Sequence, residues 1–222
     1  MALSLPFALA QAADIVPTRS VTANGMTVLF LEQHFLPTVE IHALVKVGSA
    51  QDPPDKAGLA NLTASLLDEG TLTRTSRQIA EQIDFVGGSL EAHAAEDFTT
   101  ASTRVLKKDA DLGFALLADM LQHPAFHKQE FERVRTQILG EIVSGDDDPG
   151  NVAMKAFHQL IFHGHPYSWP AHGTEETLNK ITVADIQQFH AREYLPNQTI
   201  LVIVGDLTQD QAAALVQTHF GS

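Results

Sequence analysis

The stretch that most constrains the fold is residues 58–71, Gly-Leu-Ala-Asn-Leu-Thr-Ala-Ser-Leu-Leu-Asp-Glu-Gly-Thr. Its leucines recur at helical spacing, at positions 59, 62, 66 and 67, and predict an amphipathic helix with one buried face. Gly70 provides a stop signal for that helix. The other face carries Asn61, Ala64 and Ser65, three side chains with little chemistry of their own.

Composition narrows the class of protein. The 222 residues are 44% apolar, which is enough to bury a sizeable core. Asp and Glu outnumber Lys and Arg by 27 to 14, and a surface with a net charge of -13 repels phosphate backbones. We therefore expect no nucleic-acid partner. No apolar segment reaches the roughly 20 residues of a membrane span, and the absence of cysteine excludes disulfides and thiolate chemistry.

The first residues, 1–13, carry no charge and end in Ala-Gln-Ala-Ala. They resemble the later part of a secretory signal with its small-residue cleavage site, although the basic n-region is missing. We expect residues 1–13 to be a signal-peptide remnant and the protein to be periplasmic or otherwise exported. The alternative is a cytoplasmic protein with an apolar N-terminus. Residues 20–222 are interpreted as a single domain, because no internal repeat, low-complexity tract or long linker divides them.

The remaining pattern predicts an α+β fold, with helices packed on a mixed, largely antiparallel sheet. Asn24-Gly25 lies between two short strand-like runs, 20–22 and 26–31, and is a strong hairpin signal. Ser76, Thr182 and Thr208 are the expected N-caps of three helices. Further strands are expected at residues 39–47, 89–93, 98–106 and 199–204, further helices at 112–122, 128–144 and 152–162, and a loop at 163–174.

Three segments carry a family resemblance. Residues 58–71 resemble the metal-binding helix of the pitrilysin/insulinase-type zinc peptidases, which include the mitochondrial processing peptidases. That family shows Gly-Leu-x-His-x-x-Glu-His followed by a Gly-Thr pair, and Gly58-Leu59 and Gly70-Thr71 match it. Residues 132–142 and the tail from His165 to Gly205 resemble the same family. The likeness runs from about residue 20 to the end, the length of one of the family's two homologous halves.

The resemblance assigns family positions to particular residues. In the family motif, two histidines at i and i+4 bind one zinc ion, and the Glu between them is the general base. Asn61 takes the first histidine position, Ala64 the Glu position and Ser65 the second histidine position. The family's third ligand is a Glu about 80 residues after the first His, and Glu141 lies 80 residues after Asn61. Val134 stands where the family usually carries a supporting acidic residue.

These substitutions imply that the chain has no catalytic residue and binds no zinc of its own. Amide and hydroxyl groups, as in Asn61 and Ser65, are poor zinc ligands compared with imidazoles, and Glu141 alone is too few. Ala64 cannot accept a proton from water, so a captured metal would still lack its base. No cofactor is therefore expected here, and zinc would be held only by a partner subunit.

The 11 histidines raise the question of a relocated metal site. Residues 93–97, His-Ala-Ala-Glu-Asp, have a ligand-like look, but on a strand these side chains diverge, and polar residues at a strand end are the simpler interpretation. His163 and His165 are interpreted as bracing their loop. In the family, the strand that corresponds to residues 89–93 lies at the edge of the sheet and lines the substrate cleft. The resemblance therefore implies that Glu91 and His93 contact peptide.

Two functions of different classes remain open. The first is a zinc-less partner subunit that helps bind an extended peptide for an active zinc-binding homologue, as a heterodimer or against a second homologous half. The second is a structural scaffold or peptide-binding protein with no peptidase role, as in the respiratory-complex core proteins of the family. A zinc-dependent endopeptidase with a non-standard site is a third, minor alternative.

Overall fold

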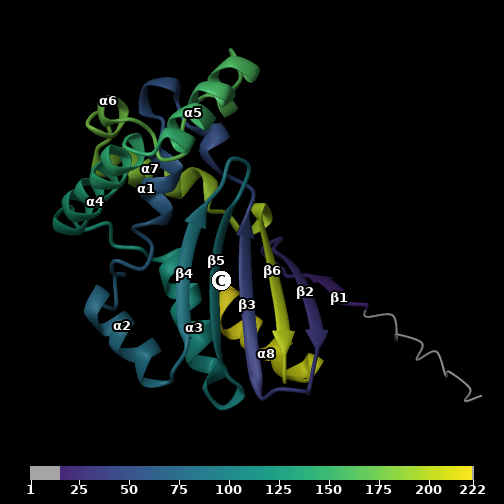
Figure 1. The fold of residues 1–222 in the computed structure, drawn as a ribbon. Helices are drawn as coiled ribbons and strands as arrows, with labels where there is room; N and C mark the ends of the chain where they lie inside the picture. Colours follow the sequence, from purple (N-terminus) through teal and green to yellow (C-terminus); the bar gives the residue numbers. More distant parts are fainter. Residues whose placement is uncertain (1–15, 222) are drawn as a thin grey trace, which may run out of the picture.

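The protein forms one mixed sheet with helices packed on it. The computed structural model describes residues 16–221, so the expected signal-peptide remnant lies outside the described residues. Within them the strand order is β1-β2-β6-β3-β5-β4, shown in Figure 1. Neighbouring strands are antiparallel except β2 and β6, which are parallel, so the predicted fold class is confirmed. The strands are β1 (Thr18–Val21), β2 (Thr27–Glu32), β3 (Thr38–Val45), β4 (Ser89–Ala94), β5 (Thr99–Leu106) and β6 (Thr199–Gly205).

Helices occupy most of the chain between and after these strands. Thr182 and Thr208 cap α7 and α8 as predicted, each accepting a hydrogen bond from the backbone three residues on. The helices are α1 (Leu59–Ala64), α2 (Ser76–Phe85), α3 (Ala110–Gln122), α4 (Lys128–Asp146), α5 (Pro149–Ile161), α6 (Glu175–Leu178), α7 (Val183–Glu193) and α8 (Gln209–Phe220).

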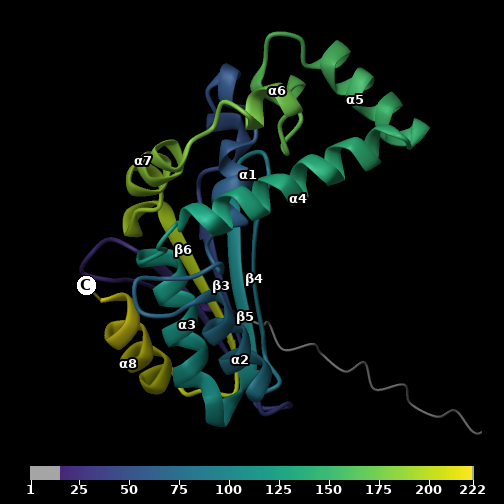
Figure 2. The same cartoon turned by 90° about the vertical axis from the view of Figure 1, so that its left-hand side faces the viewer.

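Helices cover one face of the sheet. α3 packs on β5, and α8 packs on α3 and β2, on the same side of the sheet in Figure 2. Along β3 the side chains alternate between half-buried and buried, which is the pattern of a sheet with one covered face. Ile41 and Ala43 point into the core, whereas Glu40 and His42 lie on the opposite, open face. There Glu40 forms an ion pair with Arg104 at 2.5 Å.

Five helices, α1 and α4 to α7, gather at one end of the sheet, whereas α2 lies beside β4 toward the other end (Figure 1). α1 packs against α7, and α4 crosses beside them toward α5 (Figures 1 and 2). α5 projects away from the sheet, and none of its residues is buried. Its exposed apolar side chains are Val152, Met154, Phe157, Leu160 and Ile161. In residues 16–221 no helix is long and apolar enough to cross a membrane.

Three local predictions need correction, and one feature of the sheet was not predicted. The helix expected up to Gly70 ends at Ala64, because Leu66 and Leu67 form tighter i to i−3 hydrogen bonds and both turn into the core. α2 is capped by Thr75 rather than Ser76, since Thr75 and Gln78 form a capping box. The expected loop at 163–174 contains a short 3₁₀ turn, Pro166–Ser168. The short helix α6 begins directly after the loop, at Glu175. β6 inserts between β2 and β3, which local sequence patterns did not indicate.

Candidate functional site

A cavity opens where α1, α4, the edge strand β4 and the loop before α6 meet. Its volume is about 330 Å³. It brings together five residues singled out from the sequence, namely Asn61, Ser65, Glu91, His93 and Glu141. Its other lining residues are Asp68, Glu69, Ala92, Val134, Gln137, Ile138 and His172. Segments that are far apart in the sequence therefore build one site, which we call the α1 cavity.

The backbone of α1 sets the two polar positions that face the α1 cavity. Asn61 and Ser65 are four residues apart, so they lie on the same side of the helix, one turn from each other. Ser65 is the C-terminal cap residue, and its backbone N–H donates to the carbonyl of Asn61 at 2.9 Å. Ala64 is completely buried and is not among the residues that line the cavity. The position that the resemblance assigns to the family's base thus holds a packed methyl group.

An unusual arrangement holds the start of α1. Gly58 caps the helix with a left-handed φ of +97° and has no side chain to accept a hydrogen bond. The carboxylate of Asp52 takes that role, accepting from the N–H groups of Gly58 (2.8 Å) and Ala60 (2.9 Å). A Cβ at position 58 would lie 2.7 Å from the carbonyl oxygen of His172, so the cavity loop rests directly on this glycine.

Asn61 is the most enclosed polar group of the α1 cavity. The residue as a whole is 9% exposed, and its side chain makes no hydrogen bond with any residue that the structure describes. Its amide atoms are not among the buried polar atoms that lack a partner in the described residues, so they are open to the cavity. A cavity-facing amide of this kind is therefore available for a ligand.

The α4 wall is partly apolar and partly acidic. Val134 and Ile138 are buried and face the cavity one turn apart. Glu141, one turn further, is exposed, and its Oε1 accepts a hydrogen bond from Nε2 of Gln137 at 3.1 Å. The valine at position 134 thus contributes to packing, at the point where the resemblance implies an acidic residue in the family.

The edge strand supplies the third wall. Glu91 and His93 alternate with the half-buried Leu90 and Ala92, so both project toward the open face of the sheet. They lie 3.5 Å apart, from Oε2 of Glu91 to Nε2 of His93, and both side chains are well exposed. The structure therefore brings these two residues beside Asn61, Ser65 and Glu141.

Sequence reasoning missed three residues of the site, Asp68, Glu69 and His172. Asp68 and Glu69 follow α1 in the turn that was expected to be helical, and they lie between the α1 cavity and a neighbouring cavity beside α2, lining both. Glu69 forms an ion pair with Arg133 at 2.5 Å. Burial, and next the negative charge of Glu69, raises the pKa of Asp68. A count of acidic residues near the motif could have predicted negative charge in this region, but not that the carboxylates line the cavity.

The donor set does not fit a zinc ion. Asn61 offers an amide oxygen, Ser65 a hydroxyl and Glu141 a single carboxylate, whereas zinc sites in proteins use imidazole, thiolate and carboxylate ligands. Within the described residues, no three His, Cys, Asp or Glu side chains are placed to hold a metal ion together. The chemistry that these side chains can supply is hydrogen bonding and negative charge.

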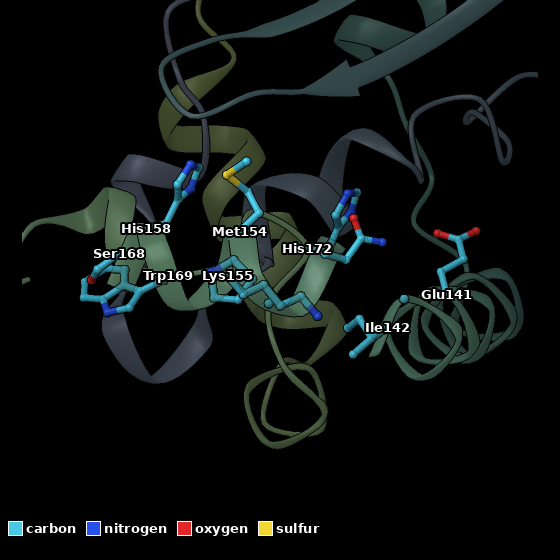
Figure 3. A pocket seen from close by; sticks show the side chains of 12 residues that line it. Glu141, Ile142, Met154, Lys155, His158, Ser168, Trp169 and His172 are labelled. Carbon is cyan, nitrogen blue, oxygen red and sulfur yellow. The ribbon is translucent and has the colours of Figure 1, made fainter. Parts of the chain in front are cut away.

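A second cavity, of about 370 Å³, adjoins the first and shares Glu141 and His172 with it. Figure 3 shows Glu141 and Ile142 of α4 on one side and Trp169, His158 and Met154 on the other, with His172 between them. Nζ of Lys155 binds Oδ1 of Asp146 at 2.7 Å, across the break between α4 and α5. This neighbouring cavity is mostly apolar and extends the site toward α5.

The fold and the site together define half of a two-part peptidase. The family model for insulinase, peptidase family M16, matches residues 27–175, and the model for the peptidase M16 inactive domain matches residues 180–222. The chain belongs to the insulinase family of peptidases, M16.

Individual relatives agree with this assignment. An uncharacterized zinc protease of Mycobacterium bovis is 33% identical over 214 residues, which are 95% of this chain and 48% of the relative. The crystal structure of a peptidase M16 inactive domain from Pseudomonas fluorescens superimposes with a TM-score of 0.87 and 27% identity, over 91% of this chain and 49% of that one. The periplasmic protease PqqL of Escherichia coli shares the fold at 19% identity, with a TM-score of 0.86 over 96% of this chain and 24% of its own.

The chain spans about half the length of the curated relatives it matches, from 38% to 48% of each. The neighbouring structures are also matched over half of their length or less. The first half of PqqL, solved separately, is matched over 47% of that chain with a TM-score of 0.84. The described chain thus corresponds to a single half of an M16-type peptidase.

Proposed function

We propose that this chain is a non-catalytic M16 subunit that binds an extended peptide on behalf of an active, zinc-binding homologue. The observation that carries the proposal is the α1 cavity itself. There Asn61, Ser65 and Glu141, the three positions that the family resemblance assigns to the metal ligands, line one cavity. The general-base position holds the buried Ala64. The architecture of a peptidase site is kept, while its metal ligands and base are replaced.

Peptide binding is supported by the edge strand. β4 is the terminal strand of the sheet within the described residues, so one side of its backbone has no strand partner. An extended peptide can add to such an edge through main-chain hydrogen bonds, with alternate side chains entering pockets. Glu91 and His93 project beside that edge, and the α1 cavity begins next to them. On this proposal Glu91 and His93 contact the bound peptide.

The proposed partner is a second M16 half. The relatives are about twice as long as this chain, which supports a homologous half as the natural counterpart. The open face of the sheet and the projecting α5 leave surface that such a half could cover. In the proposed complex this chain supplies a cleft wall and substrate contacts, and the partner holds the zinc ion and its general base.

The scaffold alternative predicts a cleft filled by its own side chains. The α1 cavity instead retains about 330 Å³ of space and an unpaired amide, which favours peptide binding over a purely structural role. A zinc-dependent endopeptidase with a non-standard site is weakened by the donor set at Asn61 and Ser65. We therefore retain peptide binding in support of a homologue as the preferred function.

The test is a mixing experiment with an M16 homologue from the same source that has an intact His-x-x-Glu-His motif. We expect co-purification and a rise in the homologue's peptidase activity on a fluorogenic peptide. A Glu91→Ala/His93→Ala variant should stimulate less. Arg77→Ala/Glu81→Ala, which removes an exposed ion pair on α2, is the matched control and should stimulate fully. The proposal would be contradicted if the wild-type protein did not stimulate the homologue, or if the two double variants stimulated it equally.

We further propose that the protein works in the periplasm. The proposal rests on the expected signal-peptide remnant at residues 1–13 and on the likeness to PqqL, which is a periplasmic protease. Fractionation of cells that express the full gene, followed by N-terminal sequencing, tests it. A mature protein that begins at Ala13 or Asp14 supports export, whereas an intact Met1 in the cytosol contradicts it.

A further inference from the structure

We propose that the α1 cavity, which contains the positions that the family resemblance assigns to the metal ligands, takes the side chain of a lysine or arginine from the bound peptide. The juxtaposition that carries this proposal is a cavity-facing amide without a hydrogen-bond partner, Asn61, beside two carboxylates that form no ion pair within the described residues, Asp68 and Glu141. It rests on the proposed function, because it names the kind of residue that a bound peptide would place there.

The first argument is the hydrogen-bonding state of Asn61. The residue lines the cavity and is 9% exposed as a whole, and its amide has no hydrogen-bond partner among the described residues. The amide atoms of Asn61 are not among the buried polar atoms that lack a partner in the described residues, so they are open to the cavity and a ligand can reach them. The amide oxygen of Asn61 and the hydroxyl of Ser65 can both accept hydrogen bonds. A ligand with several donors on one group would satisfy both.

The second argument is the charge of the cavity. Four carboxylates line it, and two of them already have cationic or titratable partners. Glu69 pairs with Arg133 at 2.5 Å, and Glu91 lies 3.5 Å from His93. The other two, Asp68 and Glu141, take part in no ion pair within the part of the chain that the structure describes.

Burial makes the charge on Asp68 unfavourable. The pKa of this carboxyl is raised by burial first and by the adjacent Glu69 second, and Arg133 and His93 offset this only in part. A cation placed in the cavity would stabilise the ionised form of Asp68, because an opposite charge nearby favours ionisation. The free energy recovered in this way contributes to ligand binding.

The third argument is shape. The cavity wall contains Val134, Ile138 and Ala92 as well as the polar groups. An apolar wall and an acidic end match a long side chain that has an aliphatic stem and a charged head. A volume of about 330 Å³ leaves room for such a stem and its head group. A bare metal ion would leave the apolar wall without a partner.

The geometry also distinguishes an organic cation from a metal ion. No three His, Cys, Asp or Glu side chains in the described chain converge as a metal-ligand set. An ammonium group has three donors and a guanidinium has five, and they require acceptors spread around them rather than ligands at about 2 Å from one centre. Asn61, Ser65, Asp68 and Glu141 offer acceptors distributed in this way.

The experiment uses the full chain and a set of fluorescent ten-residue peptides of β-forming, uncharged residues. The peptides differ at one central position, which holds Lys, Arg, norleucine or Glu. Norleucine keeps the aliphatic stem and removes the charge. Affinities are measured by fluorescence anisotropy, in the presence and absence of EDTA. We expect the Lys and Arg peptides to bind about five- to tenfold more tightly than the norleucine peptide, with no effect of EDTA.

Variants locate the effect. Asp68→Asn and Glu141→Gln should each reduce the preference for Lys over norleucine, and the double variant should abolish it. Asp147→Asn, which removes an exposed carboxylate that lines neither cavity, is the matched control and should keep the preference. Circular dichroism melts establish that each variant is folded. A preference that survives the double variant would overturn the assignment to this cavity.

The remaining outcomes separate the two proposals. Equal, measurable binding of the Lys and norleucine peptides overturns the basic-residue proposal but leaves peptide binding intact. No binding of any of the four peptides counts against both proposals. Loss of Lys-peptide binding on addition of EDTA would show that a metal ion mediates the contact, and it would overturn the assignment of an organic cation.

Discussion

The carboxylate of Asp52 accepts a hydrogen bond from the backbone N–H of Gly58 at 2.8 Å, six residues along the chain. A second bond, from the N–H of Ala60, completes a cap that the glycine itself cannot provide. α1 has only six residues, and a helix that short is not stable by itself. The position of the cavity wall therefore depends on a residue outside the helix.

Replacing Asp52 with Ala should destabilise the protein. Two buried N–H groups at the start of α1 would lose their acceptor, so we expect the free energy of unfolding to fall by about 2 kcal/mol. Urea denaturation followed by circular dichroism measures this. Asp55→Ala, at an exposed site nearby, is the control and should change stability by less than about 0.5 kcal/mol. Equal effects of the two variants would contradict the role of Asp52 as a cap.

The same residue should make stability depend on pH. Burial raises the pKa of Asp52 to about 7, against the favourable bonds from Ala60 and Gly58. Folding therefore favours the protonated carboxyl. The stabilisation of the folded protein that comes from protonated Asp52 is fully present below about pH 4 and is lost as the pH rises toward 7. Between pH 5 and pH 7, wild type should lose about 1–2 kcal/mol relative to Asp52→Asn. Urea denaturation at both pH values measures this. The same difference in unfolding free energy between the two proteins at pH 5 and at pH 7 would contradict the prediction.

Gly58 should tolerate no side chain. Gly58→Ala combines a left-handed φ of +97° with a Cβ only 2.7 Å from the carbonyl oxygen of His172. We expect a loss of about 2–4 kcal/mol and a displaced loop at the α1 cavity. Gly87→Ala is the matched control, because its φ is +64° and no atom lies within 4 Å of the added Cβ. The control should lose only about 1 kcal/mol, and thermal melts of both variants compare them.

A buried carboxylate joins α3 to the segment that follows α1. Asp119 accepts hydrogen bonds from Thr71 (2.6 Å), Thr73 (2.7 Å) and Arg74 (2.6 Å). Burial alone would raise its pKa, but these three donors outweigh burial and lower it. The stabilisation is therefore present at neutral pH and is lost as the pH falls through the lowered pKa.

Asp119→Asn should lower the free energy of unfolding at pH 7 by about 2 kcal/mol, because the amide cannot accept from all three donors. The difference should begin to shrink below about pH 4, where the unfolded carboxyl takes up a proton, and should be lost as the pH falls through the lowered pKa of the folded protein. Asp84→Asn, on the exposed side of α2, is the control. Chemical denaturation at pH 7 and pH 3 decides, and a penalty that persists unchanged at pH 3 would contradict the charge argument.

Restoring the family motif should restore metal binding. The triple variant Asn61→His/Ala64→Glu/Ser65→His should bind about one zinc ion per chain with Glu141, whereas wild type should bind none. Elemental analysis after dialysis against metal-free buffer measures this. The double variant Asn61→His/Ser65→His should also bind zinc. Zinc in the wild-type protein, or none in the variants together with intact folding, would contradict the assignment of these positions.

Local structure was predictable where local chemistry decides it. The hairpin at Asn24-Gly25 and the caps Thr182 and Thr208 follow from backbone preferences of a few residues, and all three are present. The length of α1 was not predictable, because the burial of Leu66 and Leu67 is decided by the surrounding core. The place of β6 depends on pairing with strands more than 150 residues away in the sequence.

The residues of the site also fall into those that the sequence predicted and those that it did not. Asn61, Ser65 and Glu141 were found through the family resemblance, and the structure places them on one cavity. Asp68 and Glu69 were missed, because a continuous helix to Gly70 would have directed them differently. His172 was missed because its position depends on how the loop before α6 rests on Gly58. The composition indicated an acidic protein, but the local charge of the cavity required the three-dimensional arrangement.

The position of β6 has a consequence for synthesis of the protein on the ribosome. β2 and β3 are consecutive in the sequence, yet each pairs with β6 rather than with the other. Until residues 199–205 leave the ribosome, the inner edges of both strands lack their native partner. Unpaired strand edges promote association between chains, and such long-range pairing slows folding. We therefore expect nascent chains of this protein to depend on chaperones until β6 has emerged.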